Sequence, residues 1–513
     1  MVIKIILLIV FFSVMIGVGV YTRKAATDVN GFVLGGRSVG PWLTAFAYGT
    51  SYFSAVVFVG YAGQFGYKYG LSATWIGIGN ALIGSLMAWV VLGRRTRVMS
   101  KHLKSATMPD FFGKRYHSKA IQIAAAVIAF VFLIPYTASV YSGLGKLFEM
   151  AFDVPYAACV IVMALLTAVY VILGGYMATA VNDFIQGIIM LIGIVAVVFA
   201  VLDGNGGFFE AYTKLSELES DVPITQGLRG AYVSFFGPDP VNLFGVVVLT
   251  SLGTWGLPQM VQKFYAIKDE HSIRRGTIIS TFFAIVVAGG CYFLGGFGRL
   301  VDVSAIVNKD GKLAYDMIIP TMLSKLPDIL IGIVIVLVLS ASMSTLSSLV
   351  LTSSSTITLD LIKGNIVKNL SDKKQLFIMR VFIVVFVVIS VVLAINPPTF
   401  IAQLMGISWG ALAGAFLAPL VYGLYWKGVT RAGVWAGFVA GVGVTIANMF
   451  AKWTSAINAG ALAMVSGLVV VPVISLITPK LDKGEIDFSF KCYDKKKVVE
   501  EKIALPEDVI SEQ

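Results

Sequence analysis

Long apolar runs recur along the whole chain and limit the folds that it can adopt. A helix needs roughly 20 mostly apolar residues to cross a bilayer, and thirteen runs meet that requirement. Because 57% of the residues are hydrophobic and only 13% are charged, most of the chain must face lipid or other helices. The runs are long and do not alternate, so they predict an all-α polytopic membrane protein and not a barrel. The predicted spans begin near Val2, Pro41, Ser72, Lys119, Pro155, Asp183, Val241, Arg275, Asp328, Leu376, Thr399, Ala432 and Ile457.

The distribution of Lys and Arg predicts how the spans are oriented. The loop between the third and fourth spans carries eight Lys and Arg residues, whereas the loop after the sixth carries six acidic and two basic residues. Basic loops follow the odd-numbered spans, apart from the nearly neutral loop after the fifth. The positive-inside rule then predicts a plasma (inner) membrane protein with its N-terminus outside and its C-terminus in the cytoplasm. The net charge of +11 therefore reflects topology and does not indicate nucleic-acid binding.

A stretch rich in hydroxyl groups, SASMSTLSSLVLTSSSTITLD, lies in the ninth predicted span. Residues three and four positions apart share a helix face, so Ala341, Ser344 and Thr345 form one set. Ser344, Ser347 and Ser348 form an overlapping set. Hydroxyls and backbone carbonyls suit a monovalent cation, because they bind it without the desolvation cost of several carboxylates. The alternative is that these hydroxyls bond to their own helix or allow close helix packing.

A carboxylate lies near one end of the sixth predicted span, in GGYMATAVNDFIQGIIM. Ionisable groups at membrane depth are expensive and usually functional, so Asp183 is a candidate cation ligand that could share an ion with the serine-rich face. The alternative is that Asp183 caps a helix N-terminus, where an aspartate is favoured.

Small residues and a proline interrupt two spans that lie five apart in order. In the second span they are the residues 49–51, Gly-Thr-Ser, and in the seventh span they are Gly253, Gly256 and Pro258. Unwound backbone inside a membrane is tolerated only where it lines a buried site or a cavity. Interruptions at corresponding positions of two halves indicate a transporter binding site between inverted repeats. Simple kinks would explain either interruption alone, but not their spacing.

Several motifs in this chain resemble those of the sodium:solute symporters, particularly the sodium/proline branch. They are FVLGGRSVGPWLTA, GGYMATAVNDFIQ, SMSTLSSLVLTSSSTITLDL and GISWGALAGAFLAPLVYGLYW, in that order along the chain. The resemblance implies a LeuT-type fold of about 13 transmembrane helices with a five-plus-five inverted repeat. The implied organisation is an N-terminal extra helix and loop (1–40), a first repeat (41–205), an extracellular loop (206–240), a second repeat (241–426), two C-terminal helices (427–478) and a cytoplasmic tail (479–513).

The same resemblance implies where sodium binds. The first site would consist of the carbonyl oxygens of Thr50, Phe53 and Ala341 and the hydroxyl oxygens of Ser344 and Thr345. A second site, which some family members have, would consist of Asp183, Ser344, Ser347 and Ser348. On this basis we expect two sodium ions to move with each solute.

The solute pocket departs from the pattern of the proline symporters. They carry an aspartate where this chain has Tyr52, and Trp and Tyr in the seventh span where this chain has Thr250 and Thr254. Tyr136, in PYTASVYSGLGKLFE, matches an aromatic residue of their pocket. The predicted solute-binding residues are Ser54, Tyr136, Thr254, Trp255, Gln259 and Gln403, which suit a small polar solute of the amino acid, sugar or carboxylate class.

The sequence thus predicts a sodium-coupled importer in a lipid bilayer, with Na⁺ as coupling ion and no other cofactor. An enzyme would need a nucleophile–base pair or a metal cluster, and neither is visible in the sequence. Two alternatives keep the same fold: a sensor or scaffold without transport, and a proton-coupled permease. An amine side chain near the sodium position would favour the permease. The identity of the solute and the oligomeric state do not follow from the sequence.

Overall fold

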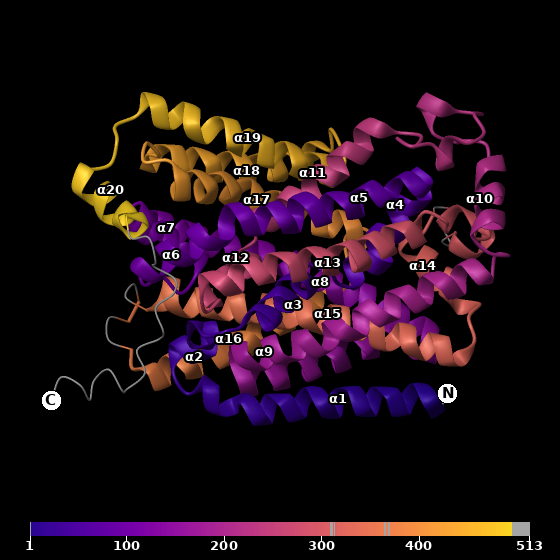
Figure 1. Ribbon diagram of the computed structural model, residues 1–513, viewed down its shortest axis with the longest axis horizontal. Coiled ribbons are helices and arrows are strands. Elements are labelled where there is room, and N and C mark those ends of the chain that lie inside the picture. Colours follow the sequence, from indigo (N-terminus) through magenta and orange to yellow (C-terminus); the bar gives the residue numbers. More distant parts are fainter. Residues whose placement is uncertain (1, 308–310, 312, 364–365, 368–369, 495–513) are drawn as a thin grey trace.

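Helices form nearly all of the regular structure that the computed structural model describes, which covers residues 2–307, 311, 313–363, 366–367 and 370–494. Most long helices run side by side along the long axis of the molecule (Figure 1). These long helices are α1 (Val2–Thr22), α8 (Lys119–Phe152), α9 (Tyr156–Asp203), α11 (Pro240–Gly256), α13 (Glu270–Gly295), α15 (Asp328–Thr356), α16 (Asp372–Ile395), α17 (Ile401–Tyr425), α18 (Arg431–Ala451) and α19 (Ala456–Ile477). The shorter ones are α2 (Val29–Leu34), α3 (Pro41–Tyr52), α4 (Ala62–Tyr69), α5 (Thr74–Gly79), α6 (Arg94–His102), α7 (Met108–Arg115), α10 (Phe208–Glu217), α12 (Pro258–Ala266), α14 (Ile318–Ser324) and α20 (Lys483–Phe490).

Within the described residues, ten helices are long and apolar enough to cross a membrane, or eleven if the bent pair α11–α12 is one span. This count does not confirm the predicted thirteen spans. Part of the difference lies in α9, which has 48 residues. A straight helix of that length would extend about 72 Å, more than twice the thickness of a hydrocarbon core.

The chain reverses inside α9 at Gly175, where φ is 54° and ψ is −147°. Before this residue, Tyr170 packs against Gly19 near the end of α1. After it, Asn182 donates to the carbonyl oxygen of Met15, one turn nearer the start of α1. A straight helix would have carried Asn182 in the other direction, past the end of α1. The helix α9 therefore consists of two antiparallel arms, which correspond to the fifth and sixth predicted spans.

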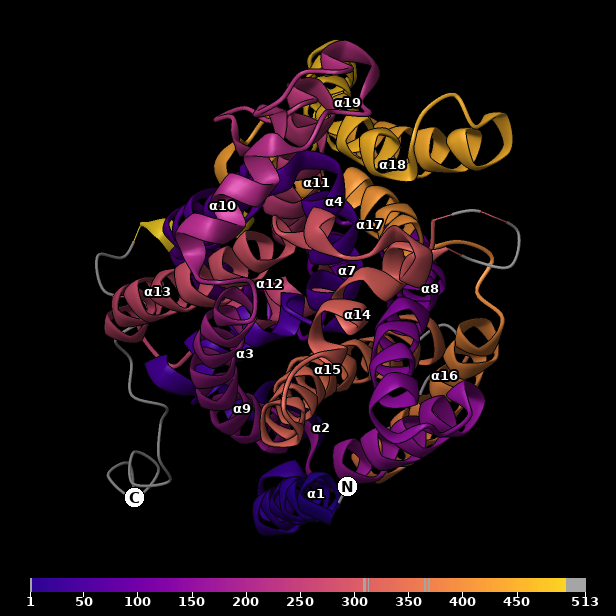
Figure 2. The same cartoon turned by 90° about the vertical axis from the view of Figure 1, so that its right-hand side faces the viewer.

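The serine-rich helix α15 lies inside the bundle (Figure 2). Its residues from Leu337 to Thr356 are buried without exception, and it packs against α1, α3, α8, α9 and α16. Figures 1 and 2 place α1 on one side of the bundle and the pair α18–α19 on the opposite side. The hydroxyl groups of α15 thus face other helices and not lipid.

Both predicted interruptions are present, but the first is displaced. Helix α3 continues through Gly49 and ends at Tyr52, after which Phe53 adopts an extended backbone with φ −93° and ψ 109°. Gly49 is needed for packing and not for unwinding, because a Cβ there would collide with the ring of Phe283. In the seventh predicted span, Leu257 is extended, and α11 and α12 meet at an angle of 46°.

The two ends of the bundle carry different loops (Figure 1). Helices α6, α7 and α20 lie at one end, whereas α10, α14 and the N-terminus of α1 lie at the other. The basic loop after the third predicted span and the acidic loop after the sixth are thus on opposite ends, as the alternation of charge predicts. Which end faces the cytoplasm stays a prediction.

Candidate functional site

Hydroxyl groups of α15 meet backbone carbonyls of α3 inside the bundle. Ser344 donates to the carbonyl oxygen of Thr50 at 3.0 Å. The Thr345 hydroxyl lies 3.2 Å from the same oxygen and 3.4 Å from the carbonyl oxygen of Phe53. Both hydroxyls also lie within 3.2 Å of the Ala341 carbonyl oxygen. The structure therefore brings together all five residues predicted for the first sodium site, and each of them is buried.

The end of α3 explains why these carbonyls are available. The last four carbonyls of a helix lack partners within that helix. Since α3 ends at Tyr52 and Phe53 is extended, the carbonyls of Thr50 and Phe53 instead face the hydroxyls of α15. A helix C-terminus is also the negative end of the helix dipole and favours a cation. Three carbonyls and two hydroxyls, none with a full charge, can hold a small monovalent cation that comes from solution.

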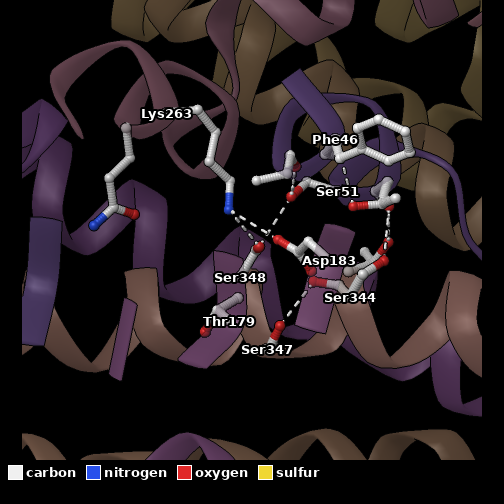
Figure 3. A network of polar contacts seen from close by, with 12 residues as sticks. Phe46, Ser51, Thr179, Asp183, Lys263, Ser344, Ser347 and Ser348 are labelled. Atoms are coloured by element: carbon white, nitrogen blue, oxygen red, sulfur yellow. Dashed lines mark hydrogen bonds and ion pairs between the residues drawn. The ribbon is translucent and has the colours of Figure 1, made fainter. Parts of the chain in front are cut away.

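A lysine reaches the second predicted sodium site from α12. The Lys263 ammonium lies 3.7 Å from Oδ2 of Asp183 and donates to Oγ of Ser348 at 2.9 Å. Ser347, the other predicted serine ligand, donates to the carbonyl oxygen of Ser344 at 2.9 Å. In Figure 3, dashed lines join the amine of Lys263 to Ser348 and to Asp183.

Burial makes the contact between Lys263 and Asp183 a strong constraint. Only 3% of the lysine side chain and none of the aspartate side chain is exposed. Neither Asp183 oxygen has a hydrogen-bond partner among the described residues. The ammonium of Lys263 is therefore the group that offsets the negative charge of the carboxylate. The lysine also lies over the ring of Tyr176, with its nitrogen 5.1 Å from the ring centroid. Either charge alone would be costly in this environment, and the pair is therefore held together.

The structure rules out the capping interpretation of Asp183. The residue lies eight positions after Gly175, the break in α9, and so about two turns inside the second arm. A capping residue would precede the first turn, where backbone N–H groups lack partners.

Lys263 was not among the predicted site residues, and only a weak signal for it is present in the sequence. It follows Pro258 by five positions, at the end of a predicted span, where a basic residue normally anchors the helix at the membrane surface. Its position four residues after Gln259 was the usable signal, because residues at that spacing share a helix face. One side of α12 thus carries both a predicted solute ligand and the lysine.

Gln259, Tyr136 and Ser54 are predicted solute residues whose side chains are fully buried. Gln259 follows the break at Leu257, and neither atom of its side-chain amide has a hydrogen-bond partner among the described residues. The Tyr136 hydroxyl is also unpartnered within that part of the chain. Ser54 follows the extended residue at the end of α3 and is fully buried. The buried, unpartnered atoms of Gln259 and Tyr136 are what a bound polar solute would satisfy, whereas Oγ of Ser54 already accepts from the backbone N–H of Val56 at 3.2 Å.

Thr254 and Trp255 differ, because the backbone of a neighbouring helix already bonds their polar atoms. The Thr254 hydroxyl donates to the carbonyl oxygen of Gly84 at 3.0 Å, and the Trp255 indole donates to that of Ile83 at 2.9 Å. Both acceptors belong to the π-helical segment Asn80–Met87. These bonds tie α11 to its neighbour.

Gln403 lies apart from the other five predicted solute residues. Its side-chain oxygen accepts from the backbone of Ala456 at 3.0 Å. It lines a cavity of about 380 Å³ together with Lys68, Asp221 and Arg299. None of the other predicted solute residues is among the described residues that line this cavity.

Two aromatic residues beside Tyr136 were not predicted. Trp409 of α17 packs against Tyr136 edge to face, with ring centroids 5.7 Å apart, and its indole nitrogen has no partner among the described residues. The hydroxyl of Tyr61 is likewise unpartnered there, in a π-helical segment that packs against α8 and α17. Trp409 lies in the motif GISWGALAG, which was a usable signal.

Comparison with known proteins was made on both sequence and structure. The family described as the sodium:solute symporter family matches residues 32–441. Sodium/proline symporter 2 of Staphylococcus saprophyticus is 32% identical over 86% of this chain and 85% of its own length. The sodium/proline symporter of Staphylococcus aureus is 31% identical over 93% of this chain and 92% of its own length.

Two solved structures share the fold. One is a Na⁺-coupled sialic acid symporter in a substrate-bound outward-open state, with a TM-score of 0.75 and 17% identity over 94% of this chain and 99% of that one. The other is Mhp1, a nucleobase-cation-symport-1 family transporter in a closed conformation, with a TM-score of 0.54 and 13% identity over 89% of this chain and 97% of that one. At these identities the likeness establishes the LeuT-type fold of the helices.

Proposed function

The chain belongs to the sodium:solute symporter family, and we propose that it imports a small, net-neutral solute of the amino-acid class together with sodium bound at the first predicted site. It is a multi-span membrane transporter, and we place it in the plasma membrane with its N-terminus outside. Transport by this fold proceeds by rocking one group of helices against the other around a site near the membrane midplane.

The observation that carries the proposal is the convergence of five oxygens between α3 and α15. The Thr50 carbonyl accepts from both hydroxyls, so hydrogen bonds hold the broken end of α3 against α15. A cation at this point would add an attraction to every one of these oxygens. Since Ser54 directly follows Phe53, sodium binding would also fix the backbone that begins the solute pocket. The two ligands would thereby favour each other's binding, which is the requirement for coupling.

The chemistry of the pocket favours a solute without net charge. None of the six predicted solute residues carries a charge at neutral pH, and a charge buried among them would lack compensation. Gln259 lies in the first turn of α12, where the positive end of a half-helix can face a carboxylate. An amino acid zwitterion meets both conditions. The relatives named sodium/proline symporters make L-proline the first solute to test.

Uptake into proteoliposomes tests this proposal. We expect labelled L-proline, or another neutral amino acid from a panel that includes sugars and carboxylates, to accumulate when sodium is outside and not when potassium replaces it. Thr345→Val should raise the sodium concentration needed for half-maximal uptake, whereas Thr345→Ser, which keeps the hydroxyl, should not. Uptake that ignores sodium and follows a proton gradient would instead support the permease, which the buried amine of Lys263 favours. Sodium binding without uptake of any solute would indicate a sensor.

A further inference from the structure

Lys263 brings a cation into the place predicted for the second sodium ion. Its ammonium contacts two of the four predicted ligands, the carboxylate of Asp183 at 3.7 Å and the hydroxyl of Ser348 at 2.9 Å. The Ser348 hydroxyl is in turn 2.9 Å from that of Ser51 in α3. The amine, the carboxylate and both hydroxyls are buried. The contacts of Lys263 are therefore made between buried side chains and not by a side chain at the surface.

An ammonium group and a sodium ion carry the same charge and are attracted by the same carboxylate. Asp183 is the one charged group among the predicted ligands of the second site, and its charge is already matched by Lys263. A sodium ion added beside the ammonium would be repelled by it, in surroundings that screen charges poorly. The hydroxyls of Ser347 and Ser348 alone do not offset that repulsion.

We propose that the ammonium of Lys263 is the resident cation of the second site, so that this transporter binds one sodium ion, at the first site, for each solute. The proposal rests on the sodium coupling proposed above and replaces the expectation of two ions. A cation on a side chain cannot leave to either side of the membrane. It therefore completes the site without drawing on the sodium gradient.

The position of Lys263 also gives the pair a structural role in the cycle. The lysine comes from α12, the half-helix after the break at Leu257, whereas Asp183 comes from α9 and Ser348 from α15. On the same face of α12, one turn earlier, lies Gln259. Lys263 thus links the half-helix that carries a solute ligand to α9 through Asp183 and, through Ser348, to the helix that carries the first sodium site, with no ion exchanged at either contact.

The test counts bound ions without knowledge of the solute. Purified full-length protein in detergent is titrated with radioactive sodium to saturation at neutral pH. We expect one ion per wild-type protein. Thr345→Val should need roughly 10- to 100-fold more sodium, and so should bind none over the concentration range that saturates the wild type. We expect two ions for Lys263→Met, which frees Asp183, and one for Lys263→Met combined with Thr345→Val. Lys146→Met, which removes a lysine that is 36% exposed on α8, is the matched control and should bind one ion.

Each outcome decides the matter. Two ions on the wild-type protein would overturn the proposal and leave sodium coupling intact. One ion on both wild type and Lys263→Met would also overturn it, because removing the lysine would then open no site. No ion on the wild type would overturn the proposed function, and this inference with it.

If Lys263→Met does not fold, Asp183→Asn combined with Lys263→Met replaces it, since no buried charge is left unpaired. The proposal requires one ion for that variant, as for the wild type; none would overturn it.

Discussion

Ser344 and Thr345 face the broken end of α3, whereas Ser348, one turn further along α15, faces the Lys263–Asp183 pair. The same helix supplies hydroxyl oxygens to both places, so α15 does not determine how they differ. The difference lies in the opposite wall. At the first site that wall is a helix end with carbonyl oxygens and no full charge. At the second it is a carboxylate that a lysine already neutralises.

This contrast separates a site that must recruit its cation from one that contains it. A cluster of neutral oxygens gains from an added cation and remains tolerable without one, because the hydroxyls can donate to the carbonyls. A buried ionised carboxylate has no such alternative, and it needs a positive charge beside it for as long as it stays ionised. The first site can therefore load and release an ion during each cycle, and the second can stay closed.

The largest effect is expected for Asp183→Asn. The substitution leaves the Lys263 ammonium buried without its carboxylate, and breaking a buried pair in this way costs about 3–5 kcal/mol. Thermal unfolding in detergent, followed by size-exclusion chromatography, measures the loss. Sodium cannot relieve it, since the remaining charge is positive.

The double variant Asp183→Asn with Lys263→Met serves as the control for this prediction. It removes both charges, so we expect most of the stability to return. If Asp183→Asn alone unfolds at the wild-type temperature, the two side chains are not a tight pair and the contrast between the sites fails.

The second largest effect is expected at the first site. Thr345→Val removes one of five oxygens without changing the shape of the side chain, and we expect apparent sodium affinity to fall roughly 10- to 100-fold, about 1.4–2.8 kcal/mol. Sodium-dependent uptake, or sodium binding to purified protein, measures the change. Thr345→Ser keeps the hydroxyl and should remain within roughly threefold of the wild type. Equal affinities for the Val and Ser variants would remove Thr345 from the site.

The first site could be predicted from the sequence because its parts are local. Ala341, Ser344 and Thr345 share one face of a helix by spacing alone, and Thr50 and Phe53 follow from a family motif and lie three residues apart. Their convergence needs only that the end of α3 meets α15. The interruption was predicted at residues 49–51, whereas the helix ends at Tyr52. Gly49 accommodates the ring of Phe283 and does not break the helix.

The second site could not be completed from the sequence. Lys263 and Asp183 are 80 positions apart, and no spacing rule links them. Gln403 was assigned to the pocket by its polarity, but the structure bonds it to Ala456. Trp409 was missed because an aromatic residue in an apolar span is normally interpreted as a packing residue and not as a solute ligand. In each case the partner across the bundle decides the role, and a single sequence does not show that partner.

A smaller effect is expected in the solute pocket. Gln259→Ala removes an unpartnered amide that shares a face of α12 with Lys263, and losing one hydrogen bond costs about 1 kcal/mol, roughly fivefold in solute affinity. The half-saturating solute concentration at saturating sodium measures it. Thr254→Val is the comparison, because its hydroxyl is bonded to Gly84. We expect Thr254→Val to lower stability more than affinity, and the reverse for Gln259→Ala. The opposite order would move the pocket away from α12.

The smallest effect is expected for an ion pair of the same chemistry at the surface. Asp221 accepts two bonds from the Arg299 guanidinium, at 2.6 and 2.8 Å, but 60% of the aspartate side chain is exposed. Solvent screens such a pair, so Asp221→Asn should lower the free energy of unfolding by less than about 1 kcal/mol. Asp183→Asn and Asp221→Asn each remove one negative charge from an ion pair. The pair with Lys263 is buried, whereas the aspartate of the pair with Arg299 is exposed.

The pH dependence gives this last prediction its sign. The bonds from Arg299 lower the pKa of Asp221 below its ordinary value, which is about 3.9 in an unfolded chain. The contribution of the pair is therefore fully present above that value and disappears as the pH falls through the lower, folded value. Unfolding temperatures of the wild type and of Asp221→Asn should differ by a small, constant amount between pH 7 and pH 5, and should converge below about pH 4. A difference as large as that for Asp183→Asn, or one that grows as the pH falls, would mean that burial is not what distinguishes the two pairs.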